Sequence, residues 1–349
     1  MATTIRETLR IIDANFNRIG EGLRCLEDAA RLILNDAVLT EQLKAIRHQV
    51  LDRDLSFNQK LLESRDSEGD IGINTESPRE RELPIVLVAN SRRIQESLRA
   101  VEELSKLPDI KLDPDIFKKA RFGIYTIEQK LISKIMRQDK IKRLTGLYVI
   151  IDTLALKRRN PTEVASQAIR GGARIIQLRD KTLSKKELLP VAEQLKTLCD
   201  KHDTLFIVND YLDLALAVDA DGLHLGQGDL PVKTARKLLS IDQIVGCSAR
   251  TVEKAVAAQS DGADYIATGS IYPTSSKENP EIIGIERLCQ IRQAITIPLV
   301  AIGGITKENA SEVIDAGANT MAVISAVLDT TDPEKAAREM VVKIEQKRK

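Results

Sequence analysis

The chain has 349 residues, 43% of them hydrophobic, which is enough for a large core and more than the usual length of one domain. Lys and Arg number 52 against 51 for Asp and Glu, so the formal net charge of +1 excludes a global attraction to nucleic acid or to a membrane surface. Any site for an anionic ligand must therefore be local.

The N-terminus, MATTIRETLRIIDANFN, lacks the apolar core of a signal peptide, and no apolar run is long enough to span a membrane. The cysteines Cys25, Cys199, Cys247 and Cys289 are far apart and lack the spacing of metal ligands. Buried thiols in a reducing compartment are the better interpretation. We expect a soluble, cytoplasmic protein without a nucleic-acid or membrane partner.

Residues 1–140 are predicted to be mostly helical. In the segment 14–30, apolar side chains fall on one helix face and polar side chains on the opposite face, which indicates an amphipathic helix. The apolar set is Ile19, Leu23, Leu26 and Ala30, and the polar set is Asn17, Glu21, Arg24 and Asp28. A further helix is predicted over about 114–136.

The helical part contains an internal repeat with a constant offset of 75 residues. Ala14, Asn15, Arg18, Ile19, Glu21, Leu23, Arg24 and Glu27 recur as Ala89, Asn90, Arg93, Ile94, Glu96, Leu98, Arg99 and Glu102. The duplication predicts two related helices that face each other in a bundle. The charged stripe is either a solvated face with ion pairs along each helix, or the lining of a polar cavity. In the second case Arg18, Arg24, Arg93 and Arg99 would bind a phosphate or carboxylate.

Two segments of the N-terminal half are predicted to be connections. The polar segment 64–82 indicates a long loop between the repeats. The charged segment 137–143 is either an exposed connector or the tail of the preceding helix. We place the boundary there, which gives a helical domain with an internal duplication over 1–140 and a second domain over 141–349.

From Gly146 onward, short apolar runs alternate with helical segments. The runs are 147–151, 175–178, 205–208, 223–225, 244–247, 265–268, 298–302 and 321–324, and the helical segments are 162–170, 185–201, 232–239, 252–260, 285–294, 307–316 and 333–346. Small-residue turns at Gly171, Asp261 and Ala316 each end a helix just before a strand. This α/β rhythm predicts a (β/α)8 TIM barrel preceded by a mostly α-helical N-terminal domain.

Polar residues gather at the carboxyl ends of the predicted strands, where barrels carry their active sites. Gln177, Arg179, Asp180 and Lys181 follow the second strand, Asn209 and Asp210 the third, 226–229 the fourth and Ser248 the fifth. A loop running to Gly284 follows the sixth strand and carries Thr274, Ser275, Ser276 and Lys277, while Gly303 and Gly304 follow the seventh strand and Ser325 the eighth.

These residue types indicate two anion sites. Asp210 and Asp229, at the ends of adjacent parallel strands, can converge on Mg²⁺, which prefers one or two carboxylates, waters and phosphate oxygens. Arg179 and Lys181 can both reach a polyanion. The glycines after the seventh strand, together with Ser325, lie where barrels commonly bind a monophosphate through backbone N–H groups.

Each of these signals also has a structural interpretation. An aspartate at a strand end can cap the next helix, and a Gly-Gly turn can simply need a positive φ. His224 alternates with apolar neighbours and is better interpreted as a core histidine or as one that supports site residues. The functional interpretation depends on the convergence of these signals at one face of the barrel.

Six motifs, in order, resemble the thiamine-phosphate synthase (thiamine-phosphate pyrophosphorylase) family. They are QLRDK at 177–181, VND at 208–210, DGLHLGQGD at 221–229, GADY at 262–265, PTSSK at 273–277 and AIGGI at 301–305. The resemblance covers about residues 145–345. It implies a transferase that joins 4-amino-2-methyl-5-(diphosphooxymethyl)pyrimidine to a thiazole monophosphate, with thiamine monophosphate and pyrophosphate as products.

The resemblance also implies roles for individual residues. Arg179, Lys181 and Lys277 would be catalytic, and Asp210 and Asp229 would hold Mg²⁺ on the pyrophosphate. The substrate-binding residues would be Gln177, Leu178, Arg179, Asp180, Lys181, Asn209, Ser248, Thr274, Ser275, Ser276, Lys277, Gly304, Ile324 and Ser325. Pyrophosphate would leave first, and the thiazole nitrogen would capture the resulting pyrimidinylmethyl cation.

The barrel has two alternative functions: a thiazole tautomerase-like enzyme, which needs no metal-bound diphosphate, and a non-catalytic, thiazole phosphate-binding regulator. The N-terminal part resembles helical domains fused to thiamine biosynthetic enzymes, sometimes described as hydroxymethylpyrimidine-phosphate kinase-like, although no Gly-rich phosphate loop is visible. A scaffold or oligomerisation domain is the alternative. The sequence does not determine the oligomeric state, and a homo-oligomer is one of the possible states.

Overall fold

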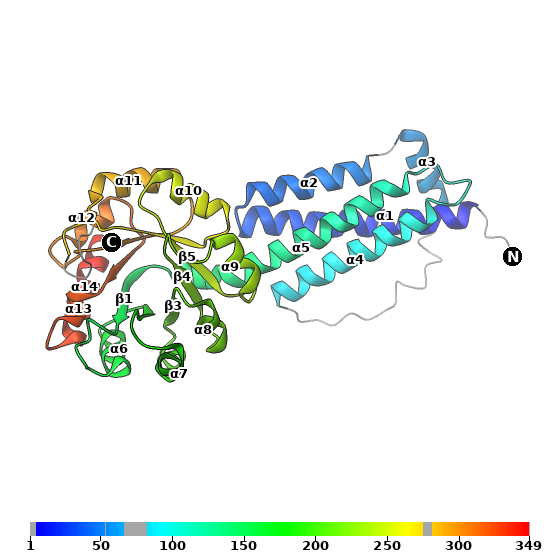
Figure 1. The fold of residues 1–349 in the computed structure, drawn as a ribbon. Coiled ribbons are helices and arrows are strands. Elements are labelled where there is room, and N and C mark those ends of the chain that lie inside the picture. The colour runs from blue at the N-terminus through cyan, green and yellow to red at the C-terminus, as the bar shows by residue number, and fades with distance from the viewer. Residues whose placement is uncertain (1–4, 53, 66–81, 275–280, 349) are drawn as a thin grey trace. The chain divides into compact units, whose positions relative to one another are not determined.

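The computed structural model describes residues 5–52, 54–65, 82–274 and 281–348 (Figure 1). It divides into two units, Met1–Met136 and Arg137–Lys349. Most of the predicted loop 64–82 lies outside the described residues. No helix in the described part of the chain is long and apolar enough to cross a membrane.

The first unit is helical, as predicted. Its elements are α1 (Ile5–Asp28), which continues as a π-helical turn η1 (Ala29–Ile33), α2 (Ala37–Leu51), α3 (Leu55–Ser64), α4 (Leu83–Leu104) and most of α5 (Pro114–Lys142). The repeated segments lie on α1 and α4. These two helices pack against each other and run in opposite directions, so the prediction that they face each other is confirmed (Figure 1).

The amphipathic pattern of α1 determines this packing. Ile19, Leu23, Leu26 and Ala30 are each 0% exposed, whereas the predicted polar set is exposed. Gly22 lets the two helices approach closely, because a Cβ at this position would lie 2.6 Å from Ile94 Cγ1. The apolar face, and not the charged stripe, is therefore the contact between α1 and α4.

The prediction of a polar cavity between the repeats is wrong. Arg18, Arg24, Arg93 and Arg99 are all exposed, because they lie on the helix faces that point away from the apolar contact. Asn15 and Asn90 each donate to a carbonyl four residues earlier in their own helix, at 2.8 and 2.9 Å. Arg99 forms ion pairs with Glu102 and Glu103, so the solvated-face interpretation fits this stripe.

Ion pairs at equivalent positions link each repeated helix to the helix that follows it in the bundle. Glu27 on α1 accepts from Arg47 on α2 at 3.0 Å, and Glu102 on α4 accepts from Arg121 on α5 at 2.9 Å. Glu27 and Glu102 are repeat partners. These two glutamates of the repeat therefore have a structural role.

Helix α5 extends beyond its predicted end at 136 to Lys142. Of the two interpretations of 137–143, the helix tail is correct and the exposed connector is wrong. Arg137 is 5% exposed and donates to Asp264 at 3.0 Å, and Arg236 donates to the same carboxylate at 2.7 Å. The Asp264 carboxylate thus pairs with two guanidinium groups within the second unit, to which residues 137–142 of α5 belong.

The second unit is the predicted barrel, closed in the order β1 to β8 with all neighbouring strands parallel. The strands are β1 (Gly146–Asp152), β2 (Ile175–Arg179), β3 (Leu205–Asn209), β4 (Gly222–Leu225), β5 (Ile244–Ser248), β6 (Tyr265–Thr268), β7 (Leu299–Ile302) and β8 (Thr320–Val323). The helices are α6 (Pro161–Arg170), α7 (Lys185–Lys201), α8 (Leu212–Ala217), α9 (Val232–Leu238), α10 (Val252–Ser260), α11 (Gly284–Ala294), α12 (Ala310–Asp315), α13 (Ser325–Leu328) and α14 (Pro333–Arg348).

Most predicted elements agree with the structure to within one or two residues. The four-residue helix α13 was not predicted, because it is too short to show helical periodicity. The segment predicted as helical over 307–316 is shorter, Ala310–Asp315. The small-residue turns before strands have the expected conformation: Gly172, Gly262 and Gly317 have φ of 100°, 102° and 94°.

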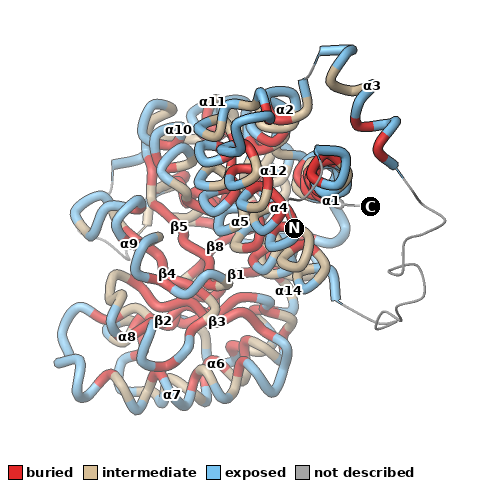
Figure 2. Tube along the Cα trace, turned by 90° about the vertical axis from the view of Figure 1, so that its right-hand side faces the viewer, coloured by how far each residue is buried: buried red, intermediate tan, exposed pale blue. Residues whose placement is uncertain are grey.

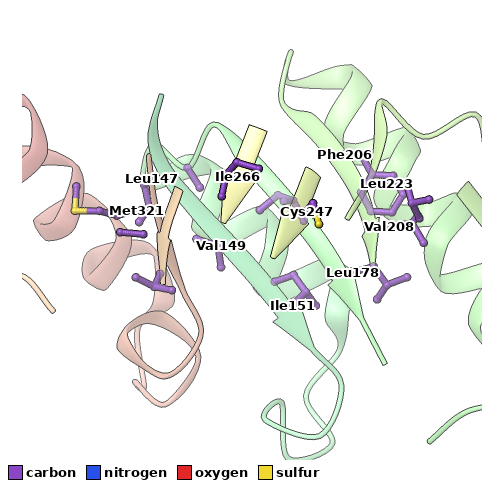
Figure 3. Close-up of a cluster of buried hydrophobic side chains, with 14 of the residues drawn as sticks. Leu147, Val149, Ile151, Leu178, Phe206, Val208, Leu223, Cys247, Ile266 and Met321 are labelled. Carbon is purple, nitrogen blue, oxygen red and sulfur yellow. The ribbon is translucent and has the colours of Figure 1, made fainter. Parts of the chain in front are cut away.

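Alternation along each strand divides the core of the barrel into two layers. On β1, Leu147, Val149 and Ile151 point outward and pack under the helices, in the cluster that Figure 3 shows. Tyr148 and Ile150 point into the barrel. Figure 2 shows the labelled strands buried along their length while the covering helices keep an exposed outer face. The inward layer therefore determines which side chains can reach a central cavity.

Candidate active site

A cavity of about 540 Å³ opens at the carboxyl ends of the strands. Every strand supplies at least one residue to its lining: Tyr148, Gln177, Asn209, His224, Ser248, Tyr265, Val300 and Ala322, in the order β1 to β8. A volume of this size suits small-molecule substrates.

The cavity brings together most of the predicted site residues. Those that line it are Gln177, Arg179, Lys181, Asn209, Asp210, Asp229, Ser248, Thr274, Gly304, Ile324 and Ser325. Ser275, Ser276 and Lys277 lie outside the described residues. The predicted substrate contacts of those three residues remain predictions.

Leu178 and Asp180 do not line the cavity. Leu178 is 1% exposed and belongs to the outer layer under the helices, because it alternates with the inward-pointing Gln177 (Figure 3). Asp180 is buried in the turn after β2, where it accepts from the N–H groups of Thr182 and Leu183 at 2.7 and 2.6 Å. A structural role for both residues fits these positions.

Asp210 and Asp229 form an acid pair on one wall of the cavity. Asp210 directly follows β3 and has a φ of 63°, a conformation that aspartate tolerates better than most residues. Its N–H donates to the His224 carbonyl at 2.8 Å. Asp229 accepts from the Gly226 N–H at 2.7 Å. Lys181 forms an ion pair with Asp210.

The two carboxyl groups lie close enough to affect each other's ionisation. Burial, and then the hydrogen bond to Asp229, raise the pKa of the Asp210 carboxyl above its usual range. Burial alone would also raise the pKa of Asp229, but the hydrogen bonds with Asp210 and with the Gly226 N–H lower it below its usual range. Two neighbouring carboxylates of this kind suit a divalent cation, because its charge can neutralise both.

The donor set limits the kind of metal. Within the described residues, no group of three or more His, Cys, Asp or Glu side chains could hold an ion. A pair of carboxylates fits Mg²⁺, because that ion keeps several waters and takes further ligands from substrate phosphates. It does not fit zinc, which usually takes three or four nitrogen or sulfur ligands.

Among the residues that the structure describes, four cationic side chains line the cavity with the acid pair: Arg179, Lys181, Arg250 and Lys254. Arg179 forms an ion pair with Asp152, its register partner at the end of β1, and Arg250 pairs with Glu281 at 3.1 Å. Clustered guanidinium and ammonium groups of this kind bind phosphate oxygens. Arg250 and Lys254 were not predicted, because single basic residues after a strand or on a helix are usually solvated.

The other side of the cavity is made by backbone. Gly303 and Gly304 have φ of 99° and 64°. A Cβ on Gly304 would lie 2.4 Å from the Pro273 carbonyl oxygen, so only glycine fits and the main chain itself faces the cavity. The two glycines at which the monophosphate site is predicted therefore line the cavity with their backbone, and the site itself stays a prediction.

A chain of hydrogen bonds crosses the floor of the cavity. Gln177 Nε2 donates to the Tyr148 hydroxyl at 2.7 Å, the Tyr148 and Tyr265 hydroxyls lie 3.2 Å apart, and Tyr265 contacts His224 Nδ1 at 3.1 Å. His224 Nε2 lies 2.9 Å from Ser248 Oγ. The two tyrosines were not predicted as site residues, since a tyrosine inside an apolar run gives no sign that its hydroxyl belongs to a network.

Comparison with known proteins identifies similar sequences for both units. A family model described as thiamine monophosphate synthase matches residues 147–327, and one described as the ThiD2 family matches residues 10–130. A thiamine-phosphate synthase of Thermosynechococcus vestitus is 37% identical over 340 residues, covering 97% of this chain and 95% of the relative. One from Synechocystis sp. is 35% identical over 342 residues, covering 96% of each.

One solved structure extends the comparison to the fold. Thiamine phosphate pyrophosphorylase from Pyrococcus furiosus is 40% identical to this chain, with a TM-score of 0.54. The match covers 58% of this chain and 96% of that structure. The sequence relatives named above therefore match nearly the whole chain, whereas this structure matches little more than half of it.

Proposed function

The chain belongs to the thiamine-phosphate synthase family and is a transferase, and from that premise we propose how its cavity works. The cavity joins 4-amino-2-methyl-5-(diphosphooxymethyl)pyrimidine to a thiazole monophosphate and releases pyrophosphate. The observation that carries this proposal is the acid pair Asp210 and Asp229, which lines the cavity together with Arg179 and Lys181.

Two phosphorylated substrates need two anion sites. The cavity offers cationic side chains on one side and glycine backbone on the other. On the charged side, Gln177, Arg179, Lys181, Asn209 and Ser248 bind the pyrimidine diphosphate. On the glycine side, Gly304, Ile324 and Ser325, with Thr274 and the loop residues Ser275 and Ser276, bind the thiazole phosphate. The glycine-rich backbone and the positive φ values support the second assignment.

Asp210 and Asp229 would hold Mg²⁺, which when bound supplies positive charge against the oxygens of the leaving pyrophosphate. Arg179 and Lys181, with Lys277 from the loop, neutralise the negative charge that grows as the methylene C–O bond breaks and its electron pair leaves with the pyrophosphate. The thiazole nitrogen then forms the new C–N bond to the methylene carbon. No proton transfer is needed, and both ring nitrogens of His224 are engaged in hydrogen bonds, which argues against a general base here.

Pyrophosphate release tests this proposal. The full chain is incubated with both substrates while the Mg²⁺ concentration is varied, and pyrophosphate is measured. Asp210→Ala should lower kcat by about 10²- to 10³-fold. Asp213→Ala is the matched control, because Asp213 is exposed, pairs with Lys185 and does not line the cavity. Near-normal Mg²⁺-dependent turnover by Asp210→Ala would contradict the metal assignment.

We also propose that residues 1–140 and 141–349 are separate domains and that the enzyme is cytoplasmic, as its four free thiols suggest. The helical domain either phosphorylates the pyrimidine monophosphate or serves as a scaffold in a homo-oligomer. ATP consumption with the pyrimidine monophosphate, measured on the full chain carrying Asp210→Ala, separates the two roles. Turnover supports the kinase. No turnover, together with an assembly larger than one chain in light scattering, supports the scaffold.

A further inference from the structure

The turn after β7 is held by hydrogen bonds to two successive carbonyl groups. The Tyr272 N–H donates to the Gly303 carbonyl at 3.0 Å, and the Asn309 side-chain amide donates to the Gly304 carbonyl at 2.9 Å. Gly303, Gly304 and Ile305 line the cavity, whereas Tyr272 and Asn309 do not. Both carbonyls therefore point toward residues outside the lining of the cavity.

The partners of the Asn309 amide fix its orientation, because a backbone carbonyl can only accept and a backbone N–H can only donate. The side-chain atom 2.9 Å from the Gly304 carbonyl oxygen is therefore the amide nitrogen, and the atom 2.8 Å from the Thr306 nitrogen is the amide oxygen. Asn309 is the N-cap residue of α12, yet its side chain makes no capping hydrogen bond. Helix capping thus does not account for these two contacts, which bridge the ends of the segment 304–306.

Each held carbonyl determines where the next N–H points. The peptide bonds of this turn are trans, and in a planar trans peptide the C=O and the N–H point in opposite directions. The N–H groups of Gly304 and Ile305 therefore point away from Tyr272 and Asn309, toward the cavity. Neither N–H has a hydrogen-bond partner among the residues that the structure describes. Two adjacent, unpaired N–H donors at a cavity wall can bind the oxygens of a phosphate group.

We propose that Asn309 is a positioning residue of the monophosphate site and that the N–H of Ile305 is one of its phosphate donors. The inference rests on the proposed function, in which the glycine side of the cavity binds the thiazole phosphate. By holding the Gly304 carbonyl, Asn309 keeps the peptide between Gly304 and Ile305 in the orientation that presents this N–H. Such a restraint is needed because glycine has more backbone freedom than any other residue, so an unheld peptide here rotates easily.

Removing the Asn309 amide affects one of the two anion sites and spares the other. Without it, the peptide between Gly304 and Ile305 can turn its carbonyl oxygen toward the cavity, where that oxygen repels a phosphate. The site then loses a donor and gains a repulsive acceptor. The residues assigned to the pyrimidine diphosphate follow or end β2 to β5, and the turn after β7 carries none of them. The diphosphate affinity should therefore stay the same.

The test is titration calorimetry of the full chain with two ligands, thiazole monophosphate and pyrophosphate with Mg²⁺. Asn309→Ala should weaken thiazole phosphate binding at least about tenfold and change the pyrophosphate affinity by less than about twofold. Asn309→Ser keeps a favourable N-cap residue but is too short to bridge both partners, so it should behave like Asn309→Ala. Asn160→Ala is the matched control, because Asn160 accepts from two N–H groups at the start of α6, at 2.9 and 3.1 Å, and does not line the cavity. It should keep both affinities.

An unchanged thiazole phosphate affinity in either folded Asn309 variant would overturn the proposal. Equal weakening of both ligands would overturn it too, because Asn309 would then only support the fold. Circular dichroism confirms the folding of each variant, and one folded variant is sufficient to decide. Pyrophosphate release by the wild type with both substrates reports separately on the proposed function. A wild type that binds the thiazole phosphate but releases no pyrophosphate would contradict that function and leave the role of Asn309 to be decided by the affinities.

Discussion

Replacing Gly246 by alanine should displace the floor of the active site. A Cβ at this position would lie 1.9 Å from Tyr265 Cζ and 2.4 Å from Cε1 and Cε2, about 1.5 Å short of ordinary contact with the nearest atom. A shift of that size breaks at least one of the hydrogen bonds that Tyr265 makes with Tyr148 and His224 at 3.2 and 3.1 Å. Overpacking costs about 1–3 kcal/mol and a buried unpaired polar group a similar amount.

The expected loss is therefore about 2–6 kcal/mol of unfolding free energy, a large part of the ~5–15 kcal/mol that holds a typical domain together. Urea unfolding followed by circular dichroism measures it. Gly228→Ala is the matched control, because a Cβ there meets nothing within 4 Å. Tyr265→Leu combined with Gly246→Ala removes the clash and should recover part of the stability. A loss below about 0.5 kcal/mol for Gly246→Ala alone would refute the steric argument.

Two further predictions concern charged groups outside the cavity. Arg137→Ala leaves the buried Asp264 carboxylate with one partner fewer and should lower the free energy of unfolding of the barrel unit by about 3 kcal/mol, measured in urea. A loss below about 1 kcal/mol would contradict the importance of this ion pair. Asp36 caps α2 and pairs with Lys134, so Asp36→Ala should cost about 1 kcal/mol at pH 7. Burial of Asp36 would raise the pKa of its carboxyl, but the hydrogen bonds from Lys134 and from the capped N–H group lower it below its usual range. The stability difference between wild type and variant should therefore be complete above about pH 4 and should vanish as the pH falls below that value. A difference that stays constant down to pH 2 would show that the carboxylate charge is not involved.

The barrel could be predicted because its signals are local and repeated. Each strand is an apolar run, each following helix has its own periodicity, and turns such as Gly171–Gly172 end helices before strands. The helix α13 (Ser325–Leu328) was not predicted, because it is too short for periodicity. In the helical unit, the apolar stripe correctly predicted the contact between α1 and α4. The stripe of arginines does not line the anion-binding cavity that one interpretation expected, because its side chains are exposed.

The candidate site was predictable where a polar residue interrupts an apolar run at a strand end, as Asp210 and Lys181 do. Alternation along β2 explains the placement of Leu178, which shares a motif with Gln177 but points to the opposite layer. Tyr148 and Tyr265 could not be predicted, because their function depends on hydroxyls from β1 and β6 meeting inside a closed barrel. Contacts across a barrel are absent from any single segment of sequence.

The binding of pyrophosphate in the presence and absence of Mg²⁺ tests most directly whether Asp210 and Asp229 form a metal site. Titration calorimetry on the wild type should give an affinity at least about tenfold higher with Mg²⁺ than without it, and Asp210→Ala should lose that gain while keeping the metal-independent affinity that Arg179 and Lys181 supply. A gain that persists in Asp210→Ala and in Asp229→Ala would contradict the assignment of the acid pair.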